Sequence, residues 1–277
     1  MPAAAEKKPR RPLPPFLVRL GHRALDHAAH AGGVATLLGE IILATGKLLR
    51  GKARFDKREF FEVLAACGAQ ALPVVALVNL LVGAILAFVG AVQLKKFGAD
   101  VFVADLVSIA SVREMAVVIT AVVLCGRTGA AFAARIATMQ GNEEIDALRT
   151  LGISPVEYLV IPRMIALTLM TPLLYFYACA VALLGGYLVA AGMLDVSSTL
   201  YWDRTAESLA GKHFVLGFLK AICFGGLVAF CGCYQGLKAG RNAAAVGEAT
   251  TAAVVTGIVG VIVVDAIFAV CAWVLSL

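Results

Sequence analysis

Long apolar stretches separated by short polar segments dominate the pattern along the chain. Two of them, Ala71–Leu94 and Met164–Leu194, contain no charged residue, and each exceeds the roughly 20 apolar residues that cross a bilayer as a helix. The pattern therefore predicts an all-α integral membrane protein whose transmembrane domain covers residues 63–277. The five expected spans are residues 71–94, 105–139, 156–191, 214–236 and 252–276.

The region before the first span has a different pattern. Residues 1–15 are basic and rich in proline, without the apolar core of a cleavable signal peptide, so a disordered cytosolic tail is expected. Residues 16–31 place apolar and charged side chains on opposite sides of a helix, which is typical of a helix on a membrane surface. Residues 34–49 contain Glu40 and Lys47, which favours an embedded or re-entrant helix over a sixth span.

Residues 16–62 are thus predicted to form an interfacial helical region. Four of its side chains, His22, Asp26, His27 and His30, have spacings that a metal site could use. The polar face of a surface helix explains the same four residues, and no metal site is predicted.

The distribution of Lys and Arg predicts the orientation, because these residues concentrate in cytoplasmic loops. Residues 1–62 hold 12 of them. The loops expected on the same side add Arg149, Arg163, Lys238 and Arg241. The opposite loops hold only Lys95, Lys96, Arg204 and Lys212. The N-terminus is therefore expected in the cytoplasm and the C-terminus outside.

Composition excludes other classes of protein. The chain is 61% hydrophobic and 15% charged, whereas soluble domains average about 45–50% and about 25%. Its seven cysteines lie mostly in apolar stretches and are odd in number, so no disulfide framework is expected. Cys231 and Cys233 have no nearby His or Asp, which favours small buried side chains over a metal or redox site. The four histidines form no nucleophile–base constellation, so an intramembrane enzyme is not expected.

A polar segment, NEEIDALRTLGISP at residues 142–155, separates two of the most apolar stretches. Asn142 suits the N-cap of a short helix and Gly152 suits the left-handed position after its last turn. A helix of about nine residues is about 14 Å long and cannot span. The pattern Ser154-Pro155-Val156-Glu157 then predicts a capping box that starts the third span. A solvated connector would not need two separately capped helices, so we predict a docking surface under the membrane.

Some polar residues fall inside the spans, where an ionisable group costs about 2.5–3.5 kcal/mol and needs a partner or a task. Arg113, Glu114 and Asp265 are predicted to line the exit of a lipid cavity, with Asn79 as the polar feature of the first span. A static ion pair that fixes helix packing is the alternative. Arg127, Arg135 and Lys220 lie nearer the ends of spans, and their side chains are expected to snorkel to the membrane surface.

One segment carries a specific resemblance. GRTGAAFAARIATMQGNEEIDALRTLGISPVEYLVIPR (126–163) resembles the signature of the MlaE-type permeases, the membrane subunits of ABC transporters that work with MCE proteins. The similarity extends to QLKKFGADVFVADLVSIASVRE (93–114) and VGEATTAAVV (246–255). The family usually has Gly-Pro after the Arg-Glu pair, where this chain has Ala116 and Val117 after Met115, so no proline kink is predicted in span two.

The resemblance implies a homodimer that moves phospholipid between a bacterial inner membrane and a periplasmic MCE protein. A cytoplasmic ATPase would dock on the short helix between spans two and three, through Glu143, Glu144, Ile145, Asp146, Leu148, Arg149 and Leu151. The sequence lacks a G-x-x-x-x-G-K-[ST] phosphate loop, so ATP and Mg are expected on the partner ATPase and no cofactor or enzymatic activity on this chain. No nucleic-acid partner is expected, and the C-terminus would be periplasmic.

Two other classes of function remain as alternatives. An ion-coupled secondary transporter could use Glu114 and Asp265, but the sequence has no inverted repeat and no paired broken helices. A membrane scaffold that transports nothing would give the short polar helix no mechanism.

Overall fold

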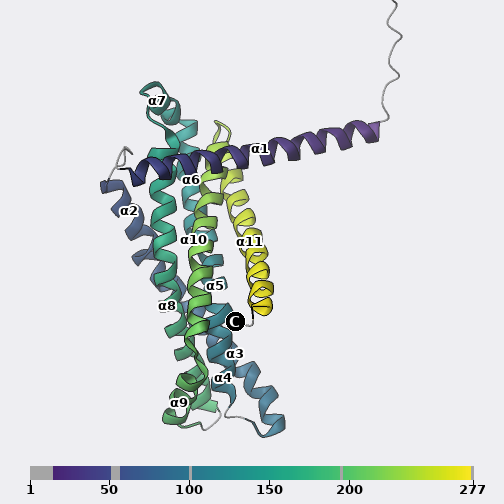
Figure 1. Ribbon diagram of the computed structural model, residues 1–277, viewed down its shortest axis with the longest axis vertical. Helices are drawn as coiled ribbons and strands as arrows, with labels where there is room; N and C mark the ends of the chain where they lie inside the picture. The colour runs from purple at the N-terminus through teal and green to yellow at the C-terminus, as the bar shows by residue number, and fades with distance from the viewer. Residues whose placement is uncertain (1–14, 51–56, 100–101, 194–195, 276–277) are drawn as a thin grey trace, which may run out of the picture.

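A computed structural model describes residues 15–50, 57–99, 102–193 and 196–275 as a helical bundle (Figure 1). The predicted N-terminal tail lies almost entirely outside these residues. Within them the regular structure is helical, as the all-α prediction requires. The first half of the chain forms α1 (Pro15–Leu49), α2 (Lys57–Cys67), η1 (Ala69–Ala71), α3 (Leu72–Leu94), η2 (Lys95–Phe97), α4 (Val103–Ala110), η4 (Ser111–Met115), α5 (Ala116–Leu124), η5 (Cys125–Gly129) and α6 (Ala130–Gly141). The second half forms α7 (Glu144–Thr150), η6 (Val156–Val160), α8 (Ile161–Met193), α9 (Ser198–Ser208), α10 (Gly211–Lys238) and α11 (Ala243–Val274).

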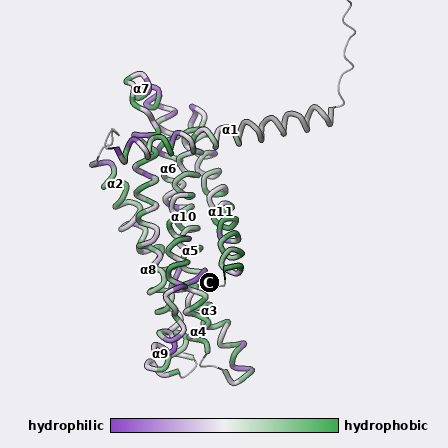
Figure 2. Tube along the Cα trace, viewed as in Figure 1, coloured by the Kyte–Doolittle hydropathy of each residue, from purple (hydrophilic) through white to green (hydrophobic). Residues whose placement is uncertain are grey.

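The five predicted spans are confirmed as long apolar helical segments. Their bounds are Arg58–Phe97, Val103–Gly141, Val156–Met193, Gly211–Lys238 and Ala243–Val274. Each predicted span lies largely within one of these segments, most of which extend beyond the prediction because polar residues continue the helices at their ends. Figure 2 shows hydrophobic colour along the bundle and hydrophilic colour at α7, which lies at one end of it, whereas α9 lies at the other end.

The N-terminal region differs from its prediction, because residues 16–31 and 34–49 form one continuous helix, α1. A sixth segment, Ala31–Leu48, is long and apolar enough to span by length and composition. It belongs to α1, however, which runs across the bundle near the α7 end (Figure 1). Leu37, Ile41 and Ala44 of α1 are buried at spacings of four and three residues, and thus form a stripe that packs on the bundle. The side chains of residues 15–30, including the three histidines, lie outside the described part.

Glycines allow α8 to pack closely in the centre of the bundle. A Cβ on Gly83 of α3 would collide with the carbonyl oxygen of Ala182, and one on Gly185 of α8 would collide with that of Leu80. Without hydrophobic drive in lipid, helix association depends on such close backbone approach. Small residues of the second and fourth spans do the same, since a Cβ on Gly232 would lie 2.6 Å from the carbonyl oxygen of Gly129. The close contacts of these glycines are therefore between helices of the same chain.

Three π-helical segments, η4, η5 and η6, interrupt the second span and begin the third. A π turn inserts one extra residue into a helix, rotates the following residues and often occurs at functional sites. Each of the three carries charge: Arg113 and Glu114 in η4, Arg127 in η5 and Glu157 in η6. The second span therefore departs from a regular α-helix at Glu114 without a proline.

Candidate functional site

A cluster of four charged side chains lies between η4, α10 and α11, with Lys220 completely buried and the side chains of Arg113, Glu114 and Asp265 25%, 27% and 22% exposed. The Lys220 ammonium group forms ion pairs with the carboxylates of Glu114 and Asp265, and its Nζ lies 2.8 Å from Oδ1 of Asp265. Arg113 Nε lies 3.8 Å from the other oxygen of Glu114. The cluster holds two positive and two negative charges, so it compensates its own charge in the apolar interior.

Lys220 corrects the sequence prediction. Its side chain is 0% exposed and does not snorkel to a membrane surface. The prediction assumed that a lysine near the end of a span reaches water, whereas the two carboxylates hold this one in the interior. Spacing along one helix does not contain that information, because Glu114, Lys220 and Asp265 come from three different spans.

A buried tyrosine helps to position the charged cluster. The hydroxyl group of Tyr175 in α8 donates a hydrogen bond of 2.8 Å to the carbonyl oxygen of Val112 in η4. Buried carbonyl groups need a hydrogen-bond donor, and the tyrosine supplies one to this π turn. A Cβ on Gly217 of α10 would collide with the same hydroxyl group. The tyrosine thus links α8 to the π turn and passes α10 only because residue 217 has no side chain.

Asn79 lies away from this charged cluster, buried between α3 and α5. Its amide nitrogen donates to the carbonyl oxygen of Val75 at 2.9 Å and contacts the hydroxyl group of Thr120 at 3.4 Å. Its side chain is 0% exposed. The structure therefore brings together Arg113, Glu114 and Asp265 but does not bring Asn79 to them.

The short helix predicted between spans two and three is α7, and one buried side chain attaches it to the bundle. Ile145 is completely buried in the main hydrophobic core and Leu148 packs partly against it. Leu151 is 70% exposed, and Glu143, Glu144 and Arg149 are exposed as well. Ile145, predicted with Leu148 and Leu151 to anchor the helix, is buried against the core of its own chain.

The start of α7 differs from its prediction. Asn142 does not cap the helix; its amide nitrogen donates to the Glu144 carboxylate at 3.0 Å. Glu143 precedes the helix with a φ of 61° and is the only non-glycine residue with positive φ in the described part of the chain. Gly152 has the predicted left-handed conformation, with a φ of 70°.

Glu157 also departs from its prediction, because it forms an ion pair with Lys47 of α1. The predicted capping box would have turned this carboxylate back toward Ser154. The interfacial helix is instead joined to the first turn of the third span. Sequence reasoning could not find this contact, because the two residues are far apart in the chain.

An arginine from the connection between α10 and α11 holds α7 from the side. Arg241 Nη2 lies 2.5 Å from a carboxylate oxygen of Asp146, and its Nη1 lies 3.4 Å from Glu143. The next residue, Asn242, caps α11 by accepting a hydrogen bond of 2.7 Å from the backbone N–H of Ala245. Arg241 thus connects α7 to the start of the helix that carries Asp265.

A second network of charged side chains, of which Arg163 is buried and Arg135 is exposed, lies near the α7 end. Glu59 of α2 pairs with Arg163 at 3.1 Å and with Arg135 at 3.7 Å. Arg163 was assigned to a loop by charge counting but is 1% exposed, inside α8. Arg127 donates to the carbonyl oxygen of Ala66 at 2.9 Å. These arginines hold α2 against the bundle.

Comparison of the sequence with known protein families gives a match over most of the chain. The sequence profile of the family described as Permease MlaE matches residues 60–271, which include nearly all of the five spans, the charged cluster and α7. The chain belongs to the MlaE permease family. The resemblance seen in the sequence is thereby confirmed, and the chain is a multi-pass membrane permease subunit.

Two of the relatives described next are named as transporter permeases, and the third has a different name. A probable ABC transporter permease protein of Rickettsia prowazekii is 39% identical over 188 residues, 68% of this chain and 73% of the relative. A protein of the same description from Synechocystis is 32% identical over 227 residues, 82% of this chain and 84% of the relative. The chloroplastic protein TRIGALACTOSYLDIACYLGLYCEROL 1 of Arabidopsis thaliana is 31% identical over 232 residues, 84% of this chain and 65% of the relative.

Proposed function

We propose that this permease moves phospholipid between a bacterial inner membrane and a periplasmic MCE protein, as a homodimer. A separate cytoplasmic ATPase, which holds ATP and Mg, drives the movement. The names of the relatives support the transporter class, because an ABC permease works with an ATPase. The name of the Arabidopsis relative contains that of a glycerolipid, which supports a lipid cargo.

The observation that carries the proposal is the construction of α7. Its buried Ile145 joins it firmly to the core, while Glu144 and the apolar Leu151 remain exposed. A helix that transmits force needs both a rigid attachment and a free surface. The predicted cytoplasmic orientation puts this surface where an ATPase is accessible.

The charged cluster is the proposed polar part of the lipid pathway. A phospholipid headgroup carries a phosphate and, in zwitterionic lipids, an ammonium group. Arg113 with Glu114 and Lys220 with Asp265 supply opposite charges in an apolar surrounding, where exchange of partners with a headgroup is possible. Movement of α11 relative to η4 would open this cluster, because Asp265 and Glu114 belong to different spans.

The proposal is tested by separating docking from transport in the reconstituted complex. Glu144→Lys with Leu151→Asp should leave insertion and dimerisation intact but abolish copurification of the ATPase, since neither residue belongs to the core. Glu114→Gln with Asp265→Asn and Lys220→Met, which removes the buried ammonium group together with its two carboxylates, should keep the ATPase bound and reduce lipid transfer to the MCE protein. Lys96→Gln, at the opposite end of the bundle, is the control for both.

Retained ATPase binding in the first variant would refute the assignment of α7. Transfer that continues without ATP but requires an ion gradient would favour the ion-coupled transporter, in which Glu114 and Asp265 exchange protons or ions.

A further inference from the structure

An apolar groove runs along the flank of the bundle between α1, α8 and α10. Its volume is about 500 Å³, within the range of about 300–1,000 Å³ that is typical of ligand pockets. Ile161, Thr168 and Leu173 of α8 line one wall, Phe218 of α10 lines another, and Ile41 and Thr45 of α1 cover the end nearest α7. None of these residues belongs to the charged cluster.

The length of the groove matches one leaflet of a bilayer. Ile161 and Leu173 are twelve positions apart in α8, which corresponds to about 18 Å of helix at about 1.5 Å per residue. Half of a hydrocarbon core is about 15 Å thick. Leu169 and Leu173 are 55% and 58% exposed, so the groove opens sideways, toward the hydrocarbon that surrounds a membrane bundle.

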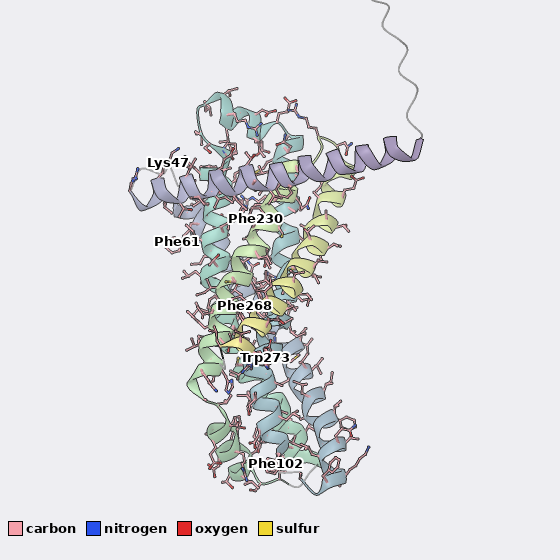
Figure 3. The ribbon with its side chains drawn as sticks, turned by 45° about the vertical axis from the view of Figure 1, so that its right-hand side comes forward. Lys47, Phe61, Phe102, Phe230, Phe268 and Trp273 are labelled. Carbon is pink, nitrogen blue, oxygen red and sulfur yellow. The ribbon has the colours of Figure 1, made fainter. Side chains whose placement is uncertain are left out.

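Paired charges lie at the covered end of the groove. Glu157 lies in η6, the π turn that leads into α8, four residues before Ile161 and thus beyond the covered end of the groove. It pairs with Lys47, whose side chain is 58% exposed. Figure 3 shows Lys47 near the end of α1 that crosses the bundle. The ammonium group of Lys47 and the carboxylate of Glu157 thus lie next to each other at one end of the apolar groove.

We propose that this groove binds one zwitterionic glycerophospholipid of the leaflet on the α7 side. One acyl chain occupies the space between α8 and α10, the phosphate lies beside Lys47, and the headgroup amine lies beside Glu157. The lipid also contacts α1 through Ile41 and Thr45, so it fastens the interfacial helix to the bundle. The site is separate from the charged cluster and requires no ATPase on α7.

The test uses the full-length permease in nanodiscs of phosphatidylethanolamine that contain an analogue with a photoreactive acyl chain. Crosslinks should concentrate on residues 161–173 and 218–222. Leu169→Trp should reduce this labelling about tenfold, because the indole ring fills the groove in place of the chain. Leu169 is exposed, so the substitution needs no rearrangement of the core. Leu188→Trp, an exposed position of α8 that does not line the groove, is the matched control.

Labelling spread evenly over the lipid-facing side of α8, or unchanged by Leu169→Trp, would overturn the site. The headgroup is tested by replacing the photoreactive lipid with phosphatidylglycerol, which has no amine. Wild-type permease should then label less, and Glu157→Gln should remove the difference between the two lipids. Equal labelling by both lipids in the wild type would overturn the headgroup assignment. The labelling experiments need no ATP and no MCE protein. They can therefore contradict the groove site without contradicting the proposed transport, and a failure of the transport experiments would leave the groove site untouched.

Discussion

Lys220 of α10 lies between Glu114 of η4 and Asp265 of α11 and forms ion pairs with both carboxylates, with its own side chain completely buried. One ammonium group therefore ties three spans together in the apolar interior. Removing one partner from a buried charge set costs far more than removing the whole set, because the remaining charges lose their compensation.

Lys220→Met should therefore destabilise the permease by about 3–5 kcal/mol, since two carboxylates are left without their shared cation. Thermal unfolding in detergent measures this effect, with Lys212→Met at an exposed position of α10 as the control. The triple variant that adds Glu114→Gln and Asp265→Asn should regain most of the lost stability. A single variant as stable as the wild type would show that the ion pairs contribute nothing.

Tyr175→Phe should destabilise the permease by about 1–3 kcal/mol, because the carbonyl group of Val112 loses its donor in the interior. The same unfolding measurement applies. Tyr177→Phe, at an exposed position of the same helix, should have little effect. If the two variants unfold alike, the hydrogen bond to the π turn does not stabilise the fold.

Arg241→Ala should lower the amount of lipid transferred per ATP hydrolysed while the ATPase stays bound, because α7 loses its connection to the start of α11. Exposed ion pairs contribute at most about 1 kcal/mol to stability, so unfolding should change little. Arg241→Lys should restore part of the transfer. An unchanged ratio of transfer to hydrolysis in Arg241→Ala would exclude this connection from coupling.

Glu143→Gly should strengthen the start of α7, because the left-handed conformation costs a non-glycine residue about 1–2 kcal/mol. Gly152→Ala should weaken the other end for the same reason. Hydrogen exchange of the α7 amides measures both, with slower exchange expected in the first variant and faster exchange in the second. Faster exchange in Glu143→Gly would mean that its pair with Arg241 matters more than backbone strain.

Particular residues show how far the sequence could be interpreted. The lengths of the apolar stretches predicted the five spans, and the polar residues 142–155 predicted α7. Both predictions depend only on residues that are neighbours in the chain. Arg113, Glu114 and Asp265 were recognised as a set because an unpaired charge in lipid is costly. Lys220 was placed wrongly, since its partners are on other spans. The π turns were missed altogether, as no local residue type marks them.

The sequence by itself determined that this chain is a helical membrane protein, approximately where its five spans lie, and which family it belongs to. Those properties follow from hydrophobic length, turn residues and a contiguous motif, all of which are local. Only the tertiary structure decided which charges pair, that Glu157 turns to Lys47 rather than to its own helix, and that Ile145 faces inward. Ion pairs and burial depend on residues that are distant in the chain and meet only when the helices pack.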